Sequence, residues 1–385
     1  MPTSLRAHTV VIGGGIIGIA TAFELARRQA GKVVLVERET LLGTGATARC
    51  AGGIRAQFSS EINCRISQLS ERIFMNFEAE VGVPAAYDQV GYLFCLTDPT
   101  QVDAFRRDLA MWQTLGLPAV WLSTEDIRRR VPELETADLL GGTFCGTDGL
   151  ADSGEFMTAY ESQARRLGVT ILAGQAVTGV RTSGGRVTAV EAGSTVIETE
   201  RAINCAGPYA AEIGRLVGLD IPIAPLKRQI CKTVPLDWVR ADLPMIVDIG
   251  SGLYMHKESG GMLMGWADPS VSPGYDQSTD ASYTDEIIMR ALARLPRLEE
   301  AAIANAWGGL YETTPDHHAI MGPVKGLEGF WISAGFSGHG FMHAPGAARL
   351  MAEWIVDGRP SIDLSRLSFE RFSGAPAWAH EVNVI

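Results

Sequence analysis

The order of apolar and polar residues at the start of the chain predicts a strand, a turn, a helix and a second strand. The residues from Thr9 to Ile12 form a short β-branched run, which suits a buried parallel strand. In the next segment apolar residues recur at three- and four-residue spacing up to Ala26, which predicts a helix that Gly31 ends. A second apolar run follows at 33–36. The front of the chain is therefore predicted to be Rossmann-like.

Helical periodicity also predicts helices that begin near Ser59, Thr100, Asp152, Tyr283 and Phe341. Ser59 or Ser60 is expected to cap the first of these helices. Between residues 222 and 266 the pattern is typical of strands, and Gly260 with Gly261 is expected to form a hairpin turn. These strands predict a broad antiparallel sheet in the second half of the chain.

The composition limits the classes of function. With 385 residues the chain exceeds the usual length of one domain, so two domains, or one domain with an insertion, are expected. A formal charge of -11 argues against binding to nucleic acid, because phosphate groups require a basic surface. No apolar run reaches the length of a membrane span. The six cysteines form no C-x-x-C pair, which predicts reduced thiols in the cytoplasm rather than a zinc or disulfide framework.

Three glycines between the first strand and the first helix, Gly13, Gly15 and Gly18, have the spacing G-x-G-x-x-G. Glycines at this spacing let a pyrophosphate approach main-chain N–H groups and the positive end of the helix. Glu37 ends the second strand, where an acidic side chain accepts hydrogen bonds from a ribose hydroxyl. The sequence therefore predicts a bound adenine dinucleotide, and this motif alone leaves NAD and FAD open.

The segment from Leu41 to Phe58 favours FAD. It is a long loop rich in glycine and alanine, at a point where a nicotinamide enzyme usually continues to a third strand. Small residues suit a bulky ring system that lies against the main chain. A flexible surface loop is the alternative, and Arg49, Arg55 and Phe58 argue against it.

A second group of glycines lies near the other end of the chain, in "GFSGHGF" from Gly335 to Phe341. Gly335, Gly338 and Gly340 remove side chains from a turn between a strand and a helix, which indicates a close approach to the main chain. The segment "AINCAGPYA", from Ala202 to Ala210, is a further strand, glycine turn and helix. The nucleotide is expected to meet the main chain there again.

Together with "GATARCAGGIRAQF" and "TTPDHHAIMG", these motifs follow the order and spacing of the FAD-dependent D-amino-acid oxidase superfamily. The chain resembles its glycine oxidase and sarcosine oxidase β-type branch. The resemblance implies an α/β fold (α+β overall), with a Rossmann-like FAD-binding domain and an inserted substrate domain built on a mixed or antiparallel sheet. The discontinuous FAD-binding domain is expected to comprise residues 1–85, 146–220 and 315–385, and the substrate-binding domain residues 86–145 and 221–314.

The resemblance also implies which residues bind FAD. The last glycine loop would face the pyrimidine edge of the flavin, and the helix after it would direct its N-terminus there. His339 lies between two glycines, so its main chain is expected to contribute rather than its ring. The residues expected to contact FAD are Gly13, Gly15, Ile16, Ile17, Gly18, Glu37, Arg38, Gly45, Ala46, Thr47, Arg49, Cys50, Ala51, Gly52, Gly53, Ile54, Val177, Cys205, Ala206, Gly207, Gly335, Phe336, Ser337, Gly338, His339, Gly340, Phe341 and Met342.

A substrate carboxylate requires a fixed cation, and the forked guanidinium of arginine matches it best. Arg55 is the first candidate, with Arg49 and Arg228 in reserve. Aromatic and polar residues of the sheet above the flavin are expected to line the substrate site, although core packing is the alternative role for each. The residues predicted to act on the substrate are Arg55, Tyr254, His256 and Tyr311.

Some positions differ from the relatives that the chain resembles. No cysteine precedes "TPD", which predicts non-covalent FAD. Met342 stands where sarcosine oxidases have a lysine, and Tyr311 where glycine oxidases have an arginine. The segment 260–266 has no lysine to assist the reaction with dioxygen. The pair His317 and His318 has no accompanying ligands and predicts no metal site.

The predicted function is FAD-dependent oxidation of the C–N bond of glycine, an N-substituted glycine or another secondary amino acid. A hydride moves to the flavin, water hydrolyses the imine, and dioxygen is the expected acceptor, giving hydrogen peroxide. One alternative is an amino-acid dehydrogenase β-type subunit that passes electrons to a partner, and another is a flavin-binding module without catalysis. The expected partners are an amino-acid or N-alkyl amino-acid substrate and dioxygen, with a homo-oligomer allowed and a cytoplasmic location.

Overall fold

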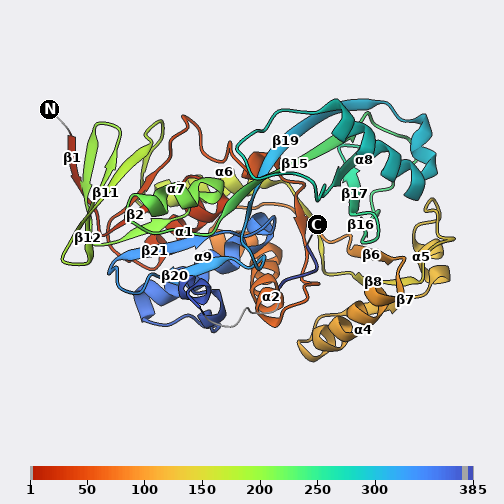
Figure 1. The fold of residues 1–385 in the computed structure, drawn as a ribbon, viewed down its shortest axis with the longest axis horizontal. Coiled ribbons are helices and arrows are strands. Elements are labelled where there is room, and N and C mark those ends of the chain that lie inside the picture. The colour runs from red at the N-terminus through yellow and green to blue at the C-terminus, as the bar shows by residue number, and fades with distance from the viewer. Residues whose placement is uncertain (1–2, 375–379, 385) are drawn as a thin grey trace.

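A computed structural model describes residues 3–374 and 380–384 of the chain. Figure 1 shows two sheet-based parts next to each other, one at the left of the view and one at the right. The left part contains a six-stranded sheet and the right part an eight-stranded sheet. The mixture of helices with parallel and antiparallel strands confirms the predicted α/β class, α+β overall.

The six-stranded sheet carries the front of the chain. Its strands, in spatial order, are β10 (Thr170–Leu172), β3 (Val33–Val36), β2 (Thr9–Ile12), β14 (Ala202–Asn204), β21 (Phe330–Ala334) and β20 (Ile320–Pro323). The first five run parallel, and β20 is antiparallel to β21. Four-residue β2 and β3 are buried at every position, which explains their unbroken apolar sequence. Three segments that are far apart in sequence thus meet in one sheet.

Helices cover this sheet as the front pattern predicts. Helix α1 (Ile16–Arg27) follows β2 directly and packs against α6 (Ser153–Arg166) and α9 (Gly340–Asp357). Helix α2 (Glu61–Met75) packs on the other side of α9. The helices that continue the two glycine loops, α1 and α9, are therefore neighbours.

The eight-stranded sheet draws its strands from two separate stretches of chain. In spatial order they are β19 (Ile303–Thr313), β15 (Ala224–Thr233), β18 (Gly261–Trp266), β17 (Leu253–Glu258), β16 (Met245–Asp248), β6 (Tyr92–Leu96), β8 (Gly141–Cys145) and β7 (Ala119–Leu122). All neighbours are antiparallel except β16 and β6. Helix α8 (Ala281–Arg294) covers β15, β17 and β18, whereas α4 (Pro99–Thr114) and α5 (Thr124–Arg130) cover β7 and β8.

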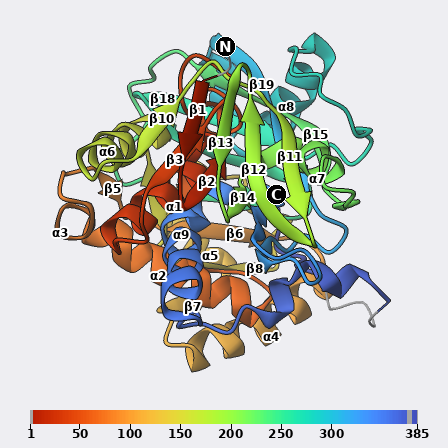
Figure 2. The same ribbon diagram turned by 90° about the vertical axis from the view of Figure 1, so that its left-hand side faces the viewer.

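Two smaller sheets complete the described chain. Figure 2 shows the four-stranded one in front, with β1 (Thr3–Arg6), β13 (Thr195–Glu198), β12 (Arg186–Ala192) and β11 (Val177–Ser183). The three-stranded one joins β4 (Gly53–Ile54), β9 (Gly149–Ala151) and β5 (Tyr87–Asp88). The remaining short helices of the described chain are α3 (Phe77–Val81), α7 (Ala210–Arg215), and the 3-10 turns η1 (Thr47–Arg49), η2 (Gly207–Tyr209), η3 (Pro296–Glu300), η4 (Ser365–Leu367) and η5 (Phe369–Phe372). The division into domains stays a prediction.

The hairpin between β17 and β18 turns one residue earlier than predicted. Ser259 and Gly260 both have positive φ, 50° and 78°, and Gly261 already belongs to β18. Two positive φ values in a two-residue loop match the twist of the flanking strands. A Cβ on Gly261 would lie 2.7 Å from the Thr233 hydroxyl, so Gly261 is needed for close packing rather than for the turn.

The predicted serine cap of α2 is replaced by a carboxylate from the other end of the chain. Ser60 occupies the N-cap position, but its side chain makes no capping bond. Instead, Glu381 accepts hydrogen bonds from the main-chain N–H and hydroxyl groups of Ser59 and Ser60, and from Asn63. A charged carboxylate at a helix start gains from the helix dipole, which a serine hydroxyl does not. Glu381 and Asn383 are both buried, so this C-terminal segment is part of the interior.

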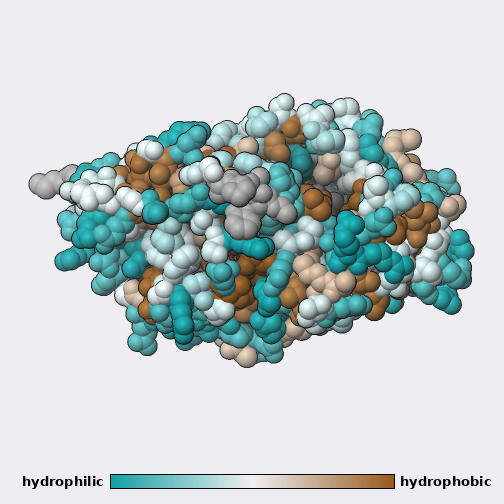
Figure 3. Space-filling view, turned by 60° about the horizontal axis from the view of Figure 1, so that its bottom comes forward, coloured by the Kyte–Doolittle hydropathy of each residue, from teal (hydrophilic) through white to brown (hydrophobic). Residues whose placement is uncertain are grey.

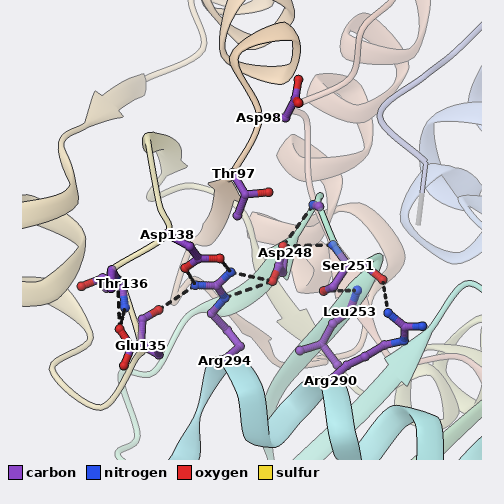
Figure 4. A network of polar contacts seen from close by, with 12 residues as sticks. Thr97, Asp98, Glu135, Thr136, Asp138, Asp248, Ser251, Leu253, Arg290 and Arg294 are labelled. Carbon is purple, nitrogen blue, oxygen red and sulfur yellow. Dashed lines mark hydrogen bonds and ion pairs between the residues drawn. The ribbon is translucent and has the colours of Figure 1, made fainter.

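A buried ion-pair network links α8 to β16 and to the segment before β8 (Figure 4). The guanidinium of Arg294 donates to Asp248 at the end of β16 and to Asp138 in the segment before β8. It also donates to the carbonyl of Glu135. Because Arg294 and Asp248 are buried, losing one partner would leave the other charge uncompensated, so this network holds both stretches of the eight-stranded sheet together.

The surface in Figure 3 is mostly hydrophilic, with hydrophobic residues in several small groups. Within residues 3–374 and 380–384, no helix combines the length and the apolar character that crossing a membrane requires.

Candidate active site

The front glycine loop, residues 13–18, packs closely against main-chain atoms of neighbouring segments. Gly13 has a φ of 109°, and a Cβ atom on it would lie 2.4 Å from the carbonyl oxygen of Cys205. A Cβ on Gly18 would lie 1.9 Å from the carbonyl oxygen of Gly13. Gly15 is less crowded, since its nearest neighbour is the Thr47 hydroxyl at 3.4 Å. Gly13 and Gly18 thus let three chain segments pack together, whereas a Cβ on Gly15 would make only an ordinary contact.

The Glu37 carboxylate organises the turn next to this loop. It accepts hydrogen bonds from the N–H of Gly14 at 2.6 Å and from the N–H of Glu39 at 2.9 Å. The guanidinium of the following residue, Arg38, stacks on the ring of Tyr209 at 3.7 Å from its centroid. The acidic residue therefore supports the loop directly, and its expected bond to a ribose hydroxyl stays a prediction.

The loop after β3 closes one side of the site. The Thr47 hydroxyl accepts a hydrogen bond from the N–H of Ile16, at the first turn of α1. Arg49 donates to the carbonyl of Gly308 in β19. A Cβ on Gly53 would lie 1.8 Å from the hydroxyl of Tyr92, so Gly53 makes room for that side chain. The small residues of this loop therefore leave space beside the loop. They also allow close packing against the eight-stranded sheet.

The back glycine loop packs on side chains of β19 and its continuation. Gly335 and Gly338 have φ values of 79° and 93°. A Cβ on Gly335 would lie 2.6 Å from Thr314, and one on Gly338 would lie 2.4 Å from the ring of Tyr311. A Cβ on Gly340 would make only ordinary contacts, since its nearest neighbours are 3.6 Å away. Gly335 and Gly338 thus allow close packing against neighbouring side chains, and the expected contact of all three glycines with a cofactor stays a prediction.

One cavity of about 600 Å³ joins the front loop, the back loop and the eight-stranded sheet, a volume typical of a cofactor or ligand site. Of the residues predicted to contact FAD or substrate, those in its wall are Gly13, Gly15, Ile16, Ile17, Glu37, Arg38, Gly45, Ala46, Thr47, Arg49, Cys50, Ala51, Gly52, Gly53, Arg55, Val177, Cys205, Ala206, Gly207, Tyr254, Tyr311, Gly338, His339, Gly340, Phe341 and Met342. Those outside the wall are Gly18, Ile54, His256, Gly335, Phe336 and Ser337.

The fit to a dinucleotide rests on the crowding around this wall. Two turns from different parts of the six-stranded sheet, at Gly13 and Cys205, touch each other, and α1 and α9 begin beside the same cavity. Main-chain N–H groups at helix starts bind phosphate and other negative charge. The residues present therefore fit an elongated anionic cofactor that spans the cavity.

The eight-stranded sheet forms one side of the cavity, called the roof below, and contributes Tyr254, Tyr311 and Arg228 to its wall. The ring of Tyr254 lies on Gly265, where a Cβ would be 2.2 Å from it. The hydroxyls of Tyr254 and Tyr311 interact, and burial raises the pKa of both. The guanidinium of Arg228 lies 5.4 Å from the centroid of the Tyr311 ring. At neutral pH both tyrosines therefore keep their protons and can donate hydrogen bonds.

Arg228 is a cation without a carboxylate partner in the described chain. One terminal nitrogen donates to the carbonyls of Lys227 and Asp268, at 3.0 and 3.5 Å. Its Nε is buried and has no hydrogen-bond partner among the described residues. A buried unpaired donor of a charged group is unfavourable until a ligand satisfies it.

In Arg55, the first candidate from the sequence, both terminal nitrogens donate hydrogen bonds to described residues, whereas in Arg228 one of them does. The terminal nitrogens of Arg55 donate to the carbonyls of Gln57, at 2.8 Å, and Asn383, and its guanidinium lies on the ring of Phe58. Only its Nε has no partner among the described residues, and burial lowers the pKa of Arg55. Arg55 touches the cavity, but one of its terminal nitrogens binds the loop at Gln57 and the other binds the C-terminal segment at Asn383.

The two histidines singled out from the sequence differ in position. His256 lies in β17 with its Nδ1 atom 2.6 Å from the carbonyl oxygen of Lys257, outside the cavity wall. His339 is in the wall, and its ring is buried edge-on against Phe58. Burial holds the pKa of His339 well below its usual value, so this ring is neutral and is not a strong base. Among the described residues no group of three or more His, Cys, Asp or Glu side chains is arranged to hold a metal ion.

Sequence reasoning missed several residues in the cavity wall. Tyr92 and Met245 come from β6 and β16, which pair only in the folded sheet, so no local motif marks them. Glu312 is also in the wall, next to the predicted Tyr311. An acidic residue directly before "TTPD" is a visible signal that could have drawn attention to it.

Comparisons with known proteins agree with this geometry. The family model described as FAD dependent oxidoreductase (DAO) matches residues 8–354. Mitochondrial dimethylglycine dehydrogenase of Mus musculus is 29% identical over 95% of this chain, which spans only 44% of that relative's length. The L-proline dehydrogenase of P. horikoshii is 31% identical, with a TM-score of 0.90 over 97% of this chain and 99% of that one.

A glycine oxidase from Geobacillus kaustophilus shares the fold, with 23% identity and a TM-score of 0.86 over 95% of this chain and 99% of its own. The family match covers both glycine loops and most of the eight-stranded sheet. The chain therefore belongs to the DAO family of FAD-dependent oxidoreductases.

Proposed function

We propose that this chain oxidises the C–N bond of an N-substituted glycine or of a secondary amino acid such as a cyclic one. The single observation that carries the proposal is that one cavity combines the cofactor loops with an unpaired arginine and two protonated tyrosines. The names of the two dehydrogenases described above support a substrate of this class.

Arg228 is proposed to bind the substrate carboxylate. Its guanidinium is in the cavity wall and has a free Nε, and a carboxylate would supply the missing acceptor. One of the two tyrosine hydroxyls would donate a further hydrogen bond to the same group, because both tyrosines keep their protons and only one of these protons lies between Tyr254 and Tyr311. Arg55 stays a second candidate, since its terminal nitrogens already donate to main-chain carbonyls.

The chain's own residues position the substrate and exclude water. Bound FAD supplies the chemistry by accepting a hydride from the carbon next to the nitrogen. The roof tyrosines and Arg228 hold the carboxylate end, which orients that carbon. Met245 and Met342 line the same wall and make it partly apolar, so water is disfavoured beside the reacting bond.

We propose that FAD is held without a covalent bond and that its electrons pass to an acceptor other than dioxygen. No cysteine stands in β19, before "TPD". No lysine is in the described part of the cavity wall, and two similar proteins are named dehydrogenases. Direct reaction with dioxygen, expected from the sequence, is the alternative. A cytoplasmic location and a homo-oligomer also stay predictions.

Anaerobic spectroscopy tests the proposed reaction. Purified protein with FAD is mixed with glycine, sarcosine, dimethylglycine, L-proline and D-amino acids in turn, and loss of the flavin absorbance is followed. Bleaching by an N-substituted or cyclic amino acid is expected, and no bleaching by any of them would favour a non-catalytic module. Admitting air then distinguishes the acceptors, because an oxidase regains its colour within seconds and a dehydrogenase within minutes.

Substitution of Arg228 tests the carboxylate site. Arg228→Ala should raise KM by about 10- to 100-fold, because hydrogen bonds to charged groups contribute about 1.5–3 kcal/mol. FAD content should not change. Arg65→Ala, at an exposed position of α2, is the matched control and should leave KM unchanged. A near-normal KM in Arg228→Ala, with a large increase in Arg55→Ala, would move the role to Arg55.

A further inference from the structure

Glu312 is a buried carboxylate in the cavity wall. It lies near the end of β19 and is 9% exposed. Its Oε2 atom accepts a hydrogen bond from the N–H of Gly335 at 3.0 Å, and the N–H of Phe336 also donates to the carboxylate. Its main-chain oxygen accepts from Ser337. The side chain is therefore fixed in place rather than free to turn toward solvent.

The carboxylate lies between two loops that face the cofactor. Its Oε1 atom is 3.6 Å from the position that a Cβ on Gly340 would occupy. Its Oε2 atom is 3.6 Å from the corresponding position on Gly207. Both glycines line the cavity, so any ligand that fills the cavity lies close to this carboxylate.

No cation balances Glu312 within the described chain. The charged or titratable residues on the elements that contact β19, and in the turns beside the carboxylate, are Arg49 in η1, Cys205 after β14, Tyr209 in η2, Lys227, Arg228, Cys231 and Lys232 in β15, Tyr311 in β19 and His339 before α9. Of these, the Cys205 thiol has an electrostatic interaction with Glu312, and burial keeps that thiol protonated by raising its pKa. The His339 ring is neutral, for the reason given above. The carboxylate is thus held by main-chain dipoles alone.

The protonation of Glu312 is poised near neutral pH. Burial raises its pKa to about 7, and the N–H groups of Gly335 and Phe336 oppose part of this effect. A new negative charge in the same cavity would raise the pKa further, because like charges interact strongly where water is scarce. A modest change in the charge of the cavity therefore changes the charge of Glu312.

We propose that Glu312 binds one proton from solvent when bound FAD is reduced and releases it when FAD is reoxidised. This inference rests on the proposed function. The substrate C–H bond breaks and delivers a hydride, two electrons and one proton, so the cavity gains one negative charge. Glu312 carboxylate and a solvent proton then form the carboxylic acid, which restores the charge. When the acceptor removes the two electrons, the proton that arrived within the hydride leaves with them or passes to solvent, and the Glu312 proton returns to solvent.

The pH dependence of the flavin midpoint potential tests this role. Each proton bound with two electrons changes the potential by about 30 mV per pH unit. In the holoenzyme, titrated spectroscopically with a chemical reductant above about pH 7, where Glu312 is ionised before reduction, the slope of the wild type should exceed that of Glu312→Gln by about 30 mV per pH unit. Equal slopes would overturn the inference.

A matched control uses a second buried carboxyl outside the cavity wall. Glu71→Gln, in α2, also removes a buried titratable group and should keep the wild-type slope. If Glu71→Gln lowers the slope as much as Glu312→Gln, the effect is general to buried carboxyls and the role of Glu312 is refuted.

A measurement on the wild type alone covers the case in which Glu312→Gln does not fold. Infrared difference spectra between oxidised and reduced holoenzyme should show a protonated carboxyl band that moves when glutamate is isotopically labelled. Absence of that band would also overturn the inference. Because the reductant is chemical, this result does not depend on the substrate, so an amino-acid panel that fails to bleach the flavin counts against the proposed function only.

Discussion

Gly13 and Gly18 in the front loop leave out side chains because main chain lies against them, whereas Gly335 and Gly338 in the back loop leave them out because side chains lie against them. The front contacts join a strand, its own helix and one neighbouring turn. The back contacts join the loop to β19, which precedes it by more than twenty residues and belongs to the other large sheet.

This difference teaches which glycine patterns carry information about a ligand. The front loop is specified locally, so its sequence predicts its structure. The back loop packs on a strand that is distant in sequence. A glycine there can make room for a side chain of that strand, which only the folded structure shows. The comparison leads to four predictions, from the largest expected effect to the smallest.

Gly18→Ala should be the most damaging of these changes. Its Cβ would lie 1.9 Å from the main-chain oxygen of Gly13, and neither segment can move without displacing β2 or α1. We expect a loss of about 3 kcal/mol or more in the free energy of unfolding, with loss of bound FAD. Urea unfolding and the ratio of flavin to protein absorbance measure both. Gly274→Ala, with no atom within 4 Å of its Cβ, is the control.

Glu312 should give the back loop a pH dependence. Its pKa is raised from 4.5 to about 7 in the folded chain, so the folded state binds more protons than the unfolded state between these values. Stability is therefore greatest below the lower value and falls as pH rises toward neutrality, by at most about 3 kcal/mol.

Comparison of unfolding at about pH 5 and pH 8 checks this, since linkage acts only across the pKa interval. Glu312→Gln should lose the pH-dependent part of the free energy of unfolding. Glu61→Gln, at an exposed site on α2, should retain it. A wild-type pH dependence in Glu312→Gln would contradict the assignment.

Gly338→Ala should have an intermediate effect, about 1–3 kcal/mol, because φ at this position is positive and the Cβ meets a side chain that can move. Displacement of Tyr311 should raise KM more than it lowers FAD content. A double-mutant cycle with Tyr311→Ala separates the two causes, since removing the ring relieves the collision but not the backbone strain. Strict additivity would show that Tyr311 does not contact residue 338.

Thr47→Val should have the smallest effect. Its hydroxyl accepts one hydrogen bond from Ile16 at the start of α1, and losing such a cap destabilises by about 1 kcal/mol. The change should lower the thermal midpoint slightly and leave KM unaltered. A loss as large as that of Gly18→Ala would mean that this hydroxyl, rather than main-chain packing, holds the front loop.

Much of the fold could be predicted because its signals are local. The βαβ order around Gly13, the helix after Gly340 and the strands before Tyr254 each show in a short window of sequence, and the structure confirms them. The turn at Ser259 and the cap of α2 differ from prediction, since both are decided by contacts with distant residues.

The candidate site was less predictable for the same reason. Whether an arginine is free to bind a ligand depends on which acceptors the fold brings to it. Arg55 meets the carbonyl of Asn383, more than three hundred residues away, and Arg228 meets no carboxylate in the described chain. The burial of Glu312 likewise requires the pairing of β19 with β15 and the loop at Gly335.

The segment 380–384 connects two parts of the molecule that lie far from it in sequence. Glu381 is the acceptor that closes the start of α2, and Asn383 touches an arginine in the wall of the cavity. Removing residues 380–384 would therefore loosen the start of α2 and an arginine of the cavity wall at the same time.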